Sequence, residues 1–322
     1  MRAVVYGKYG LDALELRDVD KPVLEDHQLL IRVHASSVNP AEWYGVTGPF
    51  FARLFGGGLR NPKSAAVGAD LAGRVESVGK DVKEFRPGDE VFGTAAGSWA
   101  EYAAAREVRL ARKPANVSFE EAAAVPIAAL TALQALRDKG RVRPGQKVLI
   151  NGASGGVGTY AVQLAKALGA DVTAVCSTRN VDVARSLGAD RVVDYTKEDF
   201  TRLAERHDLM LDIAGSRPFR QFRRVLTPKA TVVVVGAKFP SKGGIGPLSH
   251  VLGTLLASLG RSQTAKFFVA KINEEDLGFL GELLEAGKVR SVIDRRFELS
   301  ETADALRYLG EGHARGKVII TM

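Results

Sequence analysis

The stretch LINGASGGVGTYAVQLAKALGA, residues 149–170, decides the fold. It starts as an apolar run, passes through a cluster of small residues and ends as an amphipathic helical pattern. The small residues are Gly152, Ala153, Ser154, Gly155, Gly156 and Gly158. A helix N-terminus has N–H groups without intrahelical partners, and the absence of side chains lets a phosphate group reach them. We therefore predict that this turn binds the pyrophosphate of a dinucleotide; the alternative is a tight turn without a ligand.

The spacing of these glycines departs at one position from the usual fingerprint. Dinucleotide-binding turns read G-x-G-x-x-G between a strand and a helix. This chain has Ala153 at the first position, followed by Gly155 and Gly158. We expect Gly152, one residue earlier, to form the tight turn instead.

Strand-like and helix-like segments alternate from Ser118 onward. A helix is expected to begin there, because Glu121 follows three residues later and completes a capping-box pattern. The candidate strands are short, mostly apolar runs at residues 147–151, 171–176, 191–195, 209–213, 231–236 and 266–271. Amphipathic helical patterns lie between most of them. This alternation predicts an α/β fold with a parallel sheet covered by helices on both faces.

The residues before Ser118 have a different character. Short alternating segments such as HQLLIRVHASSV, residues 27–38, predict an irregular, mostly β domain. The tail reads as strand, helix and strand, and we expect it to rejoin that first domain. We therefore expect one domain at residues 1–118 and 289–322, and a second at residues 119–288.

The composition is that of an ordinary globular protein. The chain has 322 residues, of which 46% are hydrophobic and 25% are charged, and its apolar runs are too short to span a bilayer. Its first residues show no secretory or mitochondrial targeting pattern. The single cysteine, Cys176, excludes an internal disulfide and a multi-cysteine zinc site. We expect a cytoplasmic protein without a membrane partner.

The formal net charge of +8 favours acidic partners in principle. The basic residues are scattered, and the densest groups are RDKGRVR at 137–143 and RPFRQFRR at 217–224. No aromatic residues alternate with them in the manner of a nucleic-acid-binding surface. We expect most of this charge to form a solvated surface and do not expect a nucleic-acid partner; the alternative is a polyanion-binding face.

The end of the second candidate strand indicates which dinucleotide binds. NAD-binding turns place Asp or Glu there, where the carboxylate holds the ribose hydroxyls. This chain has Ser177, Thr178 and Arg179 instead. Hydroxyl groups and a guanidinium suit a 2′-phosphate, so we predict NADPH rather than NADH. Tyr195 and Lys197, after the third strand, are placed to reach the same phosphate; the alternative for Arg179 is a solvated turn residue.

Eight segments of the chain carry a family resemblance. They are SSVNPAEWYGVTG (36–48), VGADLAGRVESVG (67–79), FRPGDEVFG (85–93), GSWAEYAAA (97–105), VPIAALTALQAL (125–136), NGASGGVGTYAVQLAKALGA (151–170), SLGADRVVDY (186–195) and GKVIIT (316–321). In this order they resemble the zinc-free medium-chain dehydrogenases/reductases of the quinone oxidoreductase type. The resemblance implies a GroES-like catalytic domain made from both chain ends and a Rossmann domain between them.

The resemblance also assigns site residues. Asn39 and Tyr44 match positions that line the active-site cleft, and Thr131 matches the contact to the nicotinamide end of the cofactor. Lys317 matches a basic residue near the cleft. The expected cofactor contacts are Thr131, Ser154, Gly155, Gly156, Val157, Gly158, Ser177, Arg179, Tyr195 and Lys317.

Departures from the zinc-dependent branch predict an enzyme without a metal. That branch has a Cys ligand where this chain has Ser36, Ser37 and Asn39, and a His-Glu pair where this chain has Ala69 and Asp70. Without three ligands a catalytic zinc has no site. An enzyme without zinc needs substrates that accept hydride readily, such as quinones and α,β-unsaturated carbonyls.

We expect Tyr44 to donate a hydrogen bond or a proton to the substrate oxygen, with Asn39 as its neutral partner. The alternatives are that Tyr44 only packs in the cleft wall and that Asn39 only holds the turn before Pro40. In some relatives a tyrosine donates the proton about eleven positions after the asparagine; this chain has Phe50 there, which argues against enoyl-thioester reduction.

Two further activities remain open on the same scaffold. One is an NAD(P)-dependent alcohol dehydrogenase or enoyl reductase. The other is an NADPH-binding protein with little turnover and a structural or RNA-binding role. The segment KFFV, residues 266–269, reads as an exposed apolar edge strand, so we expect it to pair with a second copy in a homodimer.

Overall fold

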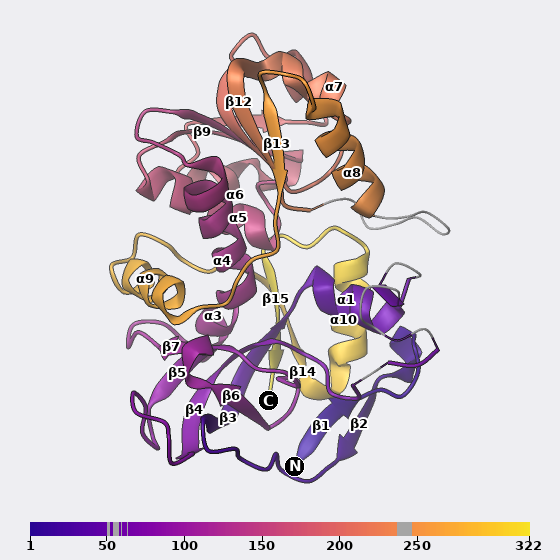
Figure 1. Ribbon diagram of the computed structural model, residues 1–322, viewed down its shortest axis with the longest axis vertical. Coiled ribbons are helices and arrows are strands. Elements are labelled where there is room, and N and C mark those ends of the chain that lie inside the picture. Colours follow the sequence, from indigo (N-terminus) through magenta and orange to yellow (C-terminus); the bar gives the residue numbers. More distant parts are fainter. Residues whose placement is uncertain (50–51, 54–57, 59, 63, 237–246) are drawn as a thin grey trace. The chain divides into compact units, whose positions relative to one another are not determined.

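The computed structural model describes residues 1–49, 52–53, 58, 60–62, 64–236 and 247–322. The chain forms two compact units: Met1–Leu130 with Lys271–Met322, and Thr131–Ala270 (Figure 1). Both ends of the chain belong to the first unit. Helix α4 (Pro126–Gln134) contains the division between the two units.

The first unit is built on mostly antiparallel strands, with one parallel pair, β14 and β15. Its strands are β1 (Arg2–Val5), β2 (Glu15–Asp18), β3 (Gln28–Val38), β4 (Asp70–Val78), β5 (Glu90–Thr94), β6 (Tyr102–Arg106), β7 (Leu110–Arg112), β14 (Ile293–Glu298) and β15 (Lys317–Thr321). Its helices are α1 (Pro40–Thr47), α3 (Phe119–Ala123), α9 (Glu274–Glu285) and α10 (Thr302–Gly310). The main sheet has the order β14-β15-β3-β4-β5-β7, with β6 also paired to β3, and β1 and β2 form a separate pair.

The tail rejoins this sheet through β15. It runs antiparallel to β3, with Ile319 opposite Ser37 and Ile320 opposite Ser36. Apolar side chains from both chain ends then share one core, in which Val38, Trp99 and Ile320 are almost completely buried. This pairing brings the end of β3 and the start of β15 together, and the polar residues of the unit gather there.

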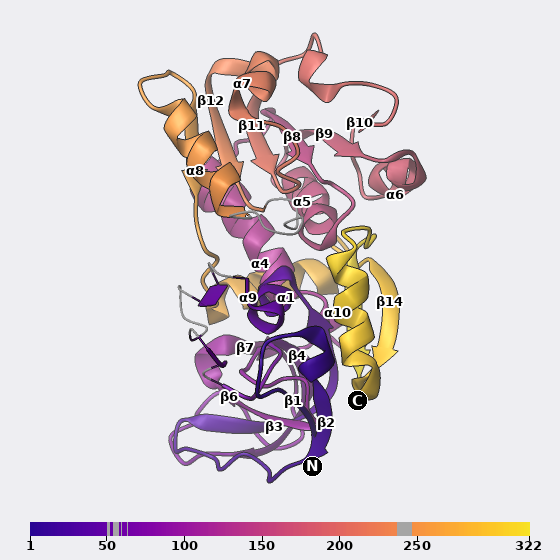
Figure 2. The same cartoon turned by 90° about the vertical axis from the view of Figure 1, so that its right-hand side faces the viewer.

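The second unit is a parallel sheet with helices. Its strands are β8 (Lys147–Asn151), β9 (Asp171–Cys176), β10 (Arg191–Asp194), β11 (His207–Asp212), β12 (Leu226–Val234) and β13 (Thr264–Phe267). Its helices are α5 (Gly156–Ala167), α6 (Val181–Ser186), α7 (Phe219–Phe222) and α8 (Pro247–Ser258). The strand order is β10-β9-β8-β11-β12-β13, and every pairing is parallel. Figure 2 shows β10, β9, β8, β11 and β12 side by side in this order.

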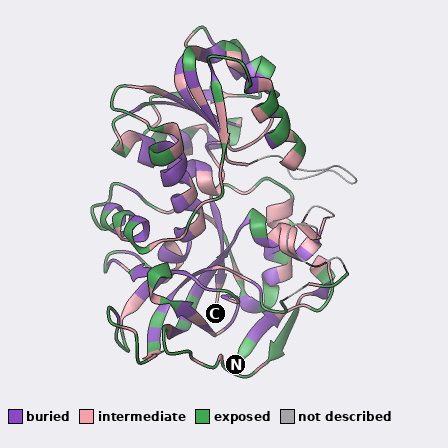
Figure 3. Ribbon diagram, viewed as in Figure 1, coloured by how far each residue is buried: buried purple, intermediate pink, exposed green. Residues whose placement is uncertain are grey.

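The strand order reverses beside β8. From β8 the chain first builds outward to β9 and β10, then crosses to the other side of β8 and builds β11, β12 and β13. This is the doubly wound, Rossmann-like arrangement that the alternating pattern predicts. The inner strands β8, β9 and β11 are buried along most of their length, whereas the edge strands β10 and β13 are mostly part-buried or exposed (Figure 3).

The predicted strands of the parallel sheet are all present. Their observed first and last residues differ from the predicted ones where the sequence signals are weak. Residues 147–151 and 171–176 are strands at the predicted positions. β12 begins at Leu226 rather than at residue 231, because Leu226 pairs with His207 before an irregularity in the register. β13 ends at Phe267, so the expected strand at 266–271 is shifted toward the N-terminus.

The predicted helix after Ser118 is divided into α3 and α4. Ser118 Oγ accepts a hydrogen bond from the N–H of Glu121 at 3.1 Å, and the Glu121 carboxylate accepts one from the N–H of Ser118 at 2.9 Å. Pro126 starts α4 and ends the first helix, because proline fits the first turn of a helix better than its interior.

The compact units and the expected domains are divided at different residues. α3 packs against β3 and β4, and α9 packs against β7. Both helices therefore belong to the compact unit of the antiparallel sheet, although the sequence change at residue 119 suggested a domain boundary.

β13 is the edge strand of the parallel sheet. Within the described residues it pairs only with β12. Of the predicted edge segment 266–269, only Lys266 and Phe267 are in the strand; Phe267 is 45% exposed, and Val269, two residues after the strand, is 79% exposed. Its pairing with a second copy remains a prediction, which light scattering at micromolar concentration would check.

Candidate functional site

The phosphate turn of the second unit lies between β8 and α5. Gly152 has φ +94°, a left-handed conformation, so it forms the tight turn that the sequence assigns to it. Gly155 is the residue before α5, and the first N–H groups of this helix, from Gly156, Val157 and Gly158, have no intrahelical partners.

The space around the glycines explains why two of them differ in role. A Cβ atom at Gly158 would lie 2.1 Å from the carbonyl oxygen of Gly152, so only glycine lets α5 approach the turn. A Cβ atom at Gly155 would meet nothing closer than that same oxygen at 3.9 Å. The open side of Gly155 and the amides of Gly156 and Val157 fit the pyrophosphate of a dinucleotide, with Ser154 part-buried beside them.

The turn after β9 carries the predicted cofactor-selecting residues. Arg179 is exposed, and Ser177 Oγ accepts a hydrogen bond from Asn180 Nδ2 at 3.1 Å. Tyr195, directly after β10, is 57% exposed, and its N–H donates to the carbonyl of Cys176 at 3.0 Å. Ser177, Arg179 and Tyr195 are therefore brought to one edge of the sheet, the carboxyl end of β9 and β10.

A carboxylate that sequence reasoning missed lies at the same edge. Asp194 ends β10 opposite Cys176. It accepts a hydrogen bond from Thr178 Oγ1 at 2.6 Å, and this bond is the main cause that holds its pKa below the usual value. Its sequence signal is its position at the end of the third candidate strand, whereas NAD-binding turns place the acid at the end of the second.

Cys176, the last residue of β9, is almost completely buried. Burial raises the pKa of its thiol to about 11, with a smaller contribution from Asp194.

A second polar group occupies the point where the strand order reverses, between β8 and β11. Asp212 ends β11 and is completely buried. Its Oδ1 accepts hydrogen bonds from Asn151 Nδ2 at 2.8 Å and from the N–H of Gly215 at 3.1 Å, and its Oδ2 lies 2.6 Å from His250 Nε2. Ligands of doubly wound sheets bind in the crevice at such a reversal. The sequence analysis identified neither Asp212 nor His250.

The chemistry of this pair is that of an imidazole oriented by a carboxylate. Because Asp212 accepts at Nε2, this nitrogen carries a proton. His250 Nδ1 has no hydrogen-bond partner among the residues that the structure describes. The pair therefore offers one further hydrogen-bonding atom at the reversal point.

In the first unit, a buried polar network surrounds Asp70. Asp70 is completely buried at the start of β4 and accepts hydrogen bonds from Ser37 Oγ at 2.6 Å, Asn39 Nδ2 at 2.9 Å and the N–H of Ile127 at 2.9 Å. Lys317 Nζ lies 3.3 Å from Asp70 and donates to Asn39 Oδ1 at 2.5 Å. Lys317 is only 3% exposed, so this is a buried ion pair.

Glu42 extends the network from α1. Its carboxylate accepts a hydrogen bond from the N–H of Asn39 at 3.0 Å. Burial raises the pKa of Glu42 to about 7, and the neighbouring charge of Asp70 adds to this increase. Glu42 therefore titrates near neutral pH.

The structure places the remaining predicted residues as follows. Tyr44 is half-buried on α1, at right angles to Trp43 with ring centres 5.2 Å apart, and burial raises the pKa of its phenol to about 12. Tyr44 thus keeps its proton at neutral pH. Thr131 is part-buried on α4. Asn39 and Lys317 bind each other and Asp70, so contacts of these two side chains with substrate or cofactor remain predictions. Phe50 lies outside the described residues.

Comparisons with known proteins agree with this architecture. Residues 25–115 match the family described as alcohol dehydrogenase GroES-like domain, and residues 187–320 match the one described as zinc-binding dehydrogenase. The chain is 36% identical to "Quinone-oxidoreductase QR1, chloroplastic" of Triphysaria versicolor, over 99% of this chain and 98% of the relative. It is 35% identical to "NADPH-dependent alkenal/one oxidoreductase, chloroplastic" of Arabidopsis thaliana, over 99% of this chain and 79% of the relative. The chain belongs to the quinone oxidoreductase-like medium-chain dehydrogenases/reductases.

A solved structure supports the same membership. The quinone oxidoreductase from Coxiella burnetii is 32% identical, with a TM-score of 0.86 over 100% of this chain and 99% of that one. The two units of this chain are therefore a GroES-like unit and a Rossmann-like unit. No described helix is long and apolar enough to cross a membrane. The cytoplasmic location remains a prediction, since the two relatives named above are chloroplastic.

The zinc in one of these family descriptions does not fit the residues present. The sequence analysis sets Ser36, Ser37 and Asn39 against the Cys ligand, and Ala69 and Asp70 against the His-Glu pair. Among these residues only Asp70 carries a carboxylate, and none carries a thiol or an imidazole. The ammonium of Lys317 already provides a positive charge beside Asp70. Among the described residues, no group of three or more His, Cys, Asp or Glu side chains could hold a metal ion.

Two glycine substitutions separate the packing role from the binding role of the turn. Gly158→Ala is expected to lower the stability of the Rossmann-like unit by about 1–3 kcal/mol, because its Cβ atom collides with backbone. Gly155→Ala is expected to leave stability within about 0.5 kcal/mol of wild type and to weaken dinucleotide binding at least about tenfold. Urea unfolding by circular dichroism and calorimetric titration of NADPH measure the two effects. Equal cofactor affinity of Gly155→Ala and wild type would contradict the assignment.

The raised pKa of Glu42 predicts a pH-dependent stability. Between pH 4.5 and about 7 the folded protein keeps a proton on Glu42 that the unfolded chain releases. The contribution of Glu42 to the free energy of unfolding is therefore full below pH 4.5 and is lost as the pH rises to about 7. Relative to Glu42→Gln, wild type should lose on the order of 3 kcal/mol of unfolding free energy across this range.

Tryptophan fluorescence reports this change selectively, because both tryptophans, Trp43 and Trp99, belong to the GroES-like unit. Glu76→Gln, at an exposed carboxylate of β4, is the control and should follow wild type. If wild type and Glu42→Gln have the same pH dependence, Glu42 is not the buried acid described above.

Proposed function

We propose that this chain is an NADPH-dependent oxidoreductase that needs no metal and transfers hydride to a quinone or an α,β-unsaturated carbonyl compound. The single observation that carries the proposal is the phosphate turn, whose open glycine and free helix amides fit a dinucleotide. The names of the relatives, a quinone oxidoreductase and an alkenal/one oxidoreductase, support the substrate class.

The residues of the Rossmann-like unit would hold the cofactor in three places. The amides of Gly156 and Val157 would bind the pyrophosphate, and Arg179 would bind a 2′-phosphate. His250 Nδ1, fixed through Asp212, would offer a hydrogen bond at the reversal point. When bound, the reduced nicotinamide supplies the hydride.

The residues of the GroES-like unit would stabilise the negative charge that develops on the substrate oxygen. Tyr44 is the donor in this proposal, because its phenol keeps its proton at neutral pH. Asn39 has a supporting role, since its side chain is held by Asp70 and Lys317. This donor set suits substrates that accept hydride without a Lewis acid, because no residue pattern for zinc accompanies it.

The choice of NADPH over NADH is set by opposing charges at the end of β9. Asp194 opposes a 2′-phosphate, while Arg179 and Lys197 attract it, and Lys197 Nζ lies 3.7 Å from Asp194. Asp194 is already hydrogen-bonded to Thr178, which reduces its capacity to accept the ribose hydroxyls of NADH. We propose that the balance favours the phosphorylated cofactor.

Activity against a substrate panel tests the proposed reaction. Wild type should oxidise NADPH, followed by its absorbance, with a quinone or an enal, and the rate should not change after dialysis against a chelator. Tyr44→Phe should lower kcat/KM by about 10- to 100-fold, because it removes the donated proton. Tyr102→Phe, on β6, is the matched control. Saturable NADPH binding without turnover of any substrate would show a binding protein instead, and an unchanged kcat/KM in Tyr44→Phe would exclude Tyr44 as donor.

Arg179→Gln tests the cofactor preference. The substitution should raise the Kd for NADPH by about 10- to 100-fold and leave the Kd for NADH nearly unchanged, because only NADPH carries the phosphate that the guanidinium binds. Calorimetric titration with both nucleotides measures the two constants. Arg185→Gln, on the exposed surface of α6, is the control. Equal affinities of wild type for NADPH and NADH would refute the preference.

A further inference from the structure

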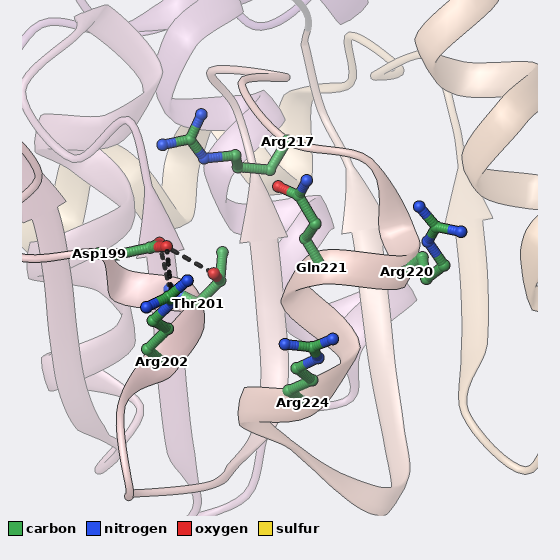
Figure 4. A pocket seen from close by; sticks show the side chains of 7 residues that line it. All are labelled: Asp199, Thr201, Arg202, Arg217, Arg220, Gln221 and Arg224. Carbon is green, nitrogen blue, oxygen red and sulfur yellow. Dashed lines mark hydrogen bonds and ion pairs between the residues drawn. The ribbon is translucent and has the colours of Figure 1, made fainter.

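The Rossmann-like unit has a second basic cavity that the proposed reaction does not use. This arginine pocket has a volume of about 530 Å³, and its lining includes Arg202, Arg217, Arg220 and Arg224, together with Asp199 and Thr201 (Figure 4). A neighbouring cavity of similar volume shares Arg220 and Arg224 and adds Arg206 and Arg223. Cavities of this size hold small ligands.

The local sequence explains why so many arginines line these two cavities. In the segment 217–224, Phe219 and Phe222 are buried at 2% and 0% exposure and anchor α7 in the core of the unit. Arg220 in α7 and Arg224 in the 3-10 turn that follows it, Arg223–Val225, are both exposed. An amphipathic pattern with arginine at its polar positions thus builds a basic surface.

The charges in the pocket are not balanced within the chain. Asp199 is the one carboxylate that lines it, and Asp199 already accepts hydrogen bonds from the N–H and the hydroxyl of Thr201 and lies 3.6 Å from Arg202. Within the described residues, Arg217, Arg220, Arg223 and Arg224 have no ion pair within 4.0 Å. Arginines elsewhere do find carboxylates, for example Arg74 with Glu90 at 2.8 Å. Like charges held together without counter-charge favour the binding of a multivalent anion.

Most of the pocket residues lie away from the cofactor turn; Arg217, which follows β11 and is next to Ser216, lies nearest to the reversal point. Thr201 and Arg202 precede β11, and Arg223 and Arg224 precede β12, so these residues lie toward the amino ends of the strands. The phosphate turn and Arg179 follow β8 and β9 and lie at the carboxyl ends. The lining is charged and polar, which suits neither a quinone nor an alkenal.

We propose that the arginine pocket binds a multivalent phosphate group of the pyrophosphate or triphosphate class, as a second anion site of this chain. Guanidinium groups match phosphate oxygens in a bidentate geometry, and several of them around one cavity select clustered phosphates over a single one. The site is independent of the proposed hydride transfer.

Calorimetric titration of inorganic tripolyphosphate into the full chain, at low salt and with saturating NADPH, tests the proposal. Arg220→Gln/Arg224→Gln should raise the Kd at least about tenfold. Arg86→Gln/Arg143→Gln, which removes the same net charge at exposed positions elsewhere, should change it less than about twofold. Arg179→Gln, titrated at an NADPH concentration that saturates this variant, should bind tripolyphosphate with an affinity unchanged from that of wild type. Orthophosphate should bind at least about tenfold more weakly than tripolyphosphate.

Three results would overturn the proposal: no heat of binding, an equal loss in both double variants, or a loss in Arg179→Gln. Circular dichroism and the affinity for NADPH show whether Arg220→Gln/Arg224→Gln is folded. Should it not fold, the single variant Arg217→Gln replaces it and is also expected to raise the Kd for tripolyphosphate.

ATP titration and co-sedimentation with phosphatidylcholine vesicles containing a phosphoinositide distinguish the two sources of clustered phosphate, and binding of either supports the site. Binding of an oligoribonucleotide but not of tripolyphosphate would refute it.

Discussion

The GroES-like unit depends on the buried contact between Asp70 and Lys317. An ammonium and a carboxylate inside a protein are stable only when both are paired and hydrogen-bonded. Here Ser37, Asn39 and the N–H of Ile127 complete the bonding of Asp70. Removing one partner of such a pair typically lowers the free energy of unfolding by about 3–5 kcal/mol. Each partner therefore holds the others in place. The contact joins residues from the two ends of the chain and therefore holds β15 in register beside β3.

The same contact supplies a physical argument for the proposed metal-independent reaction. The carboxylate that would otherwise require a cation has the ammonium of Lys317 within 3.3 Å. The residues around it are then committed to holding that charge, and Asn39 is the clearest case. In the proposed function, the group that this unit would offer to a substrate is the neutral phenol of Tyr44, which lies on α1 directly after this network. Such a substrate would have to accept hydride with only a hydrogen bond to its oxygen.

The sequence predicted the parts of the structure that short patterns encode. The strand at 147–151, the tight turn at Gly152 and the capping box of Ser118 and Glu121 are each determined by neighbouring residues, and they are present as predicted. The buried network around Asp70 and the pair of Asp212 with His250 escaped prediction. Each joins residues that are distant in the chain, and no local spacing signals which acid meets which base. Asp194 was missed for a related reason, because its position beside Cys176 comes from strand pairing.

Cys176 gives this architecture a further property. Quinones and unsaturated carbonyls alkylate thiolates, so an enzyme that handles them is at risk from its own substrates. The chain has one cysteine, which is 2% exposed, and a pKa of about 11 leaves only about one thiolate in ten thousand at neutral pH. Its sulfur is enclosed at the end of β9 by the same strand pairing that positions the cofactor-selecting turn. The proposed reductase would thus be resistant to covalent self-inactivation by the compounds it reduces.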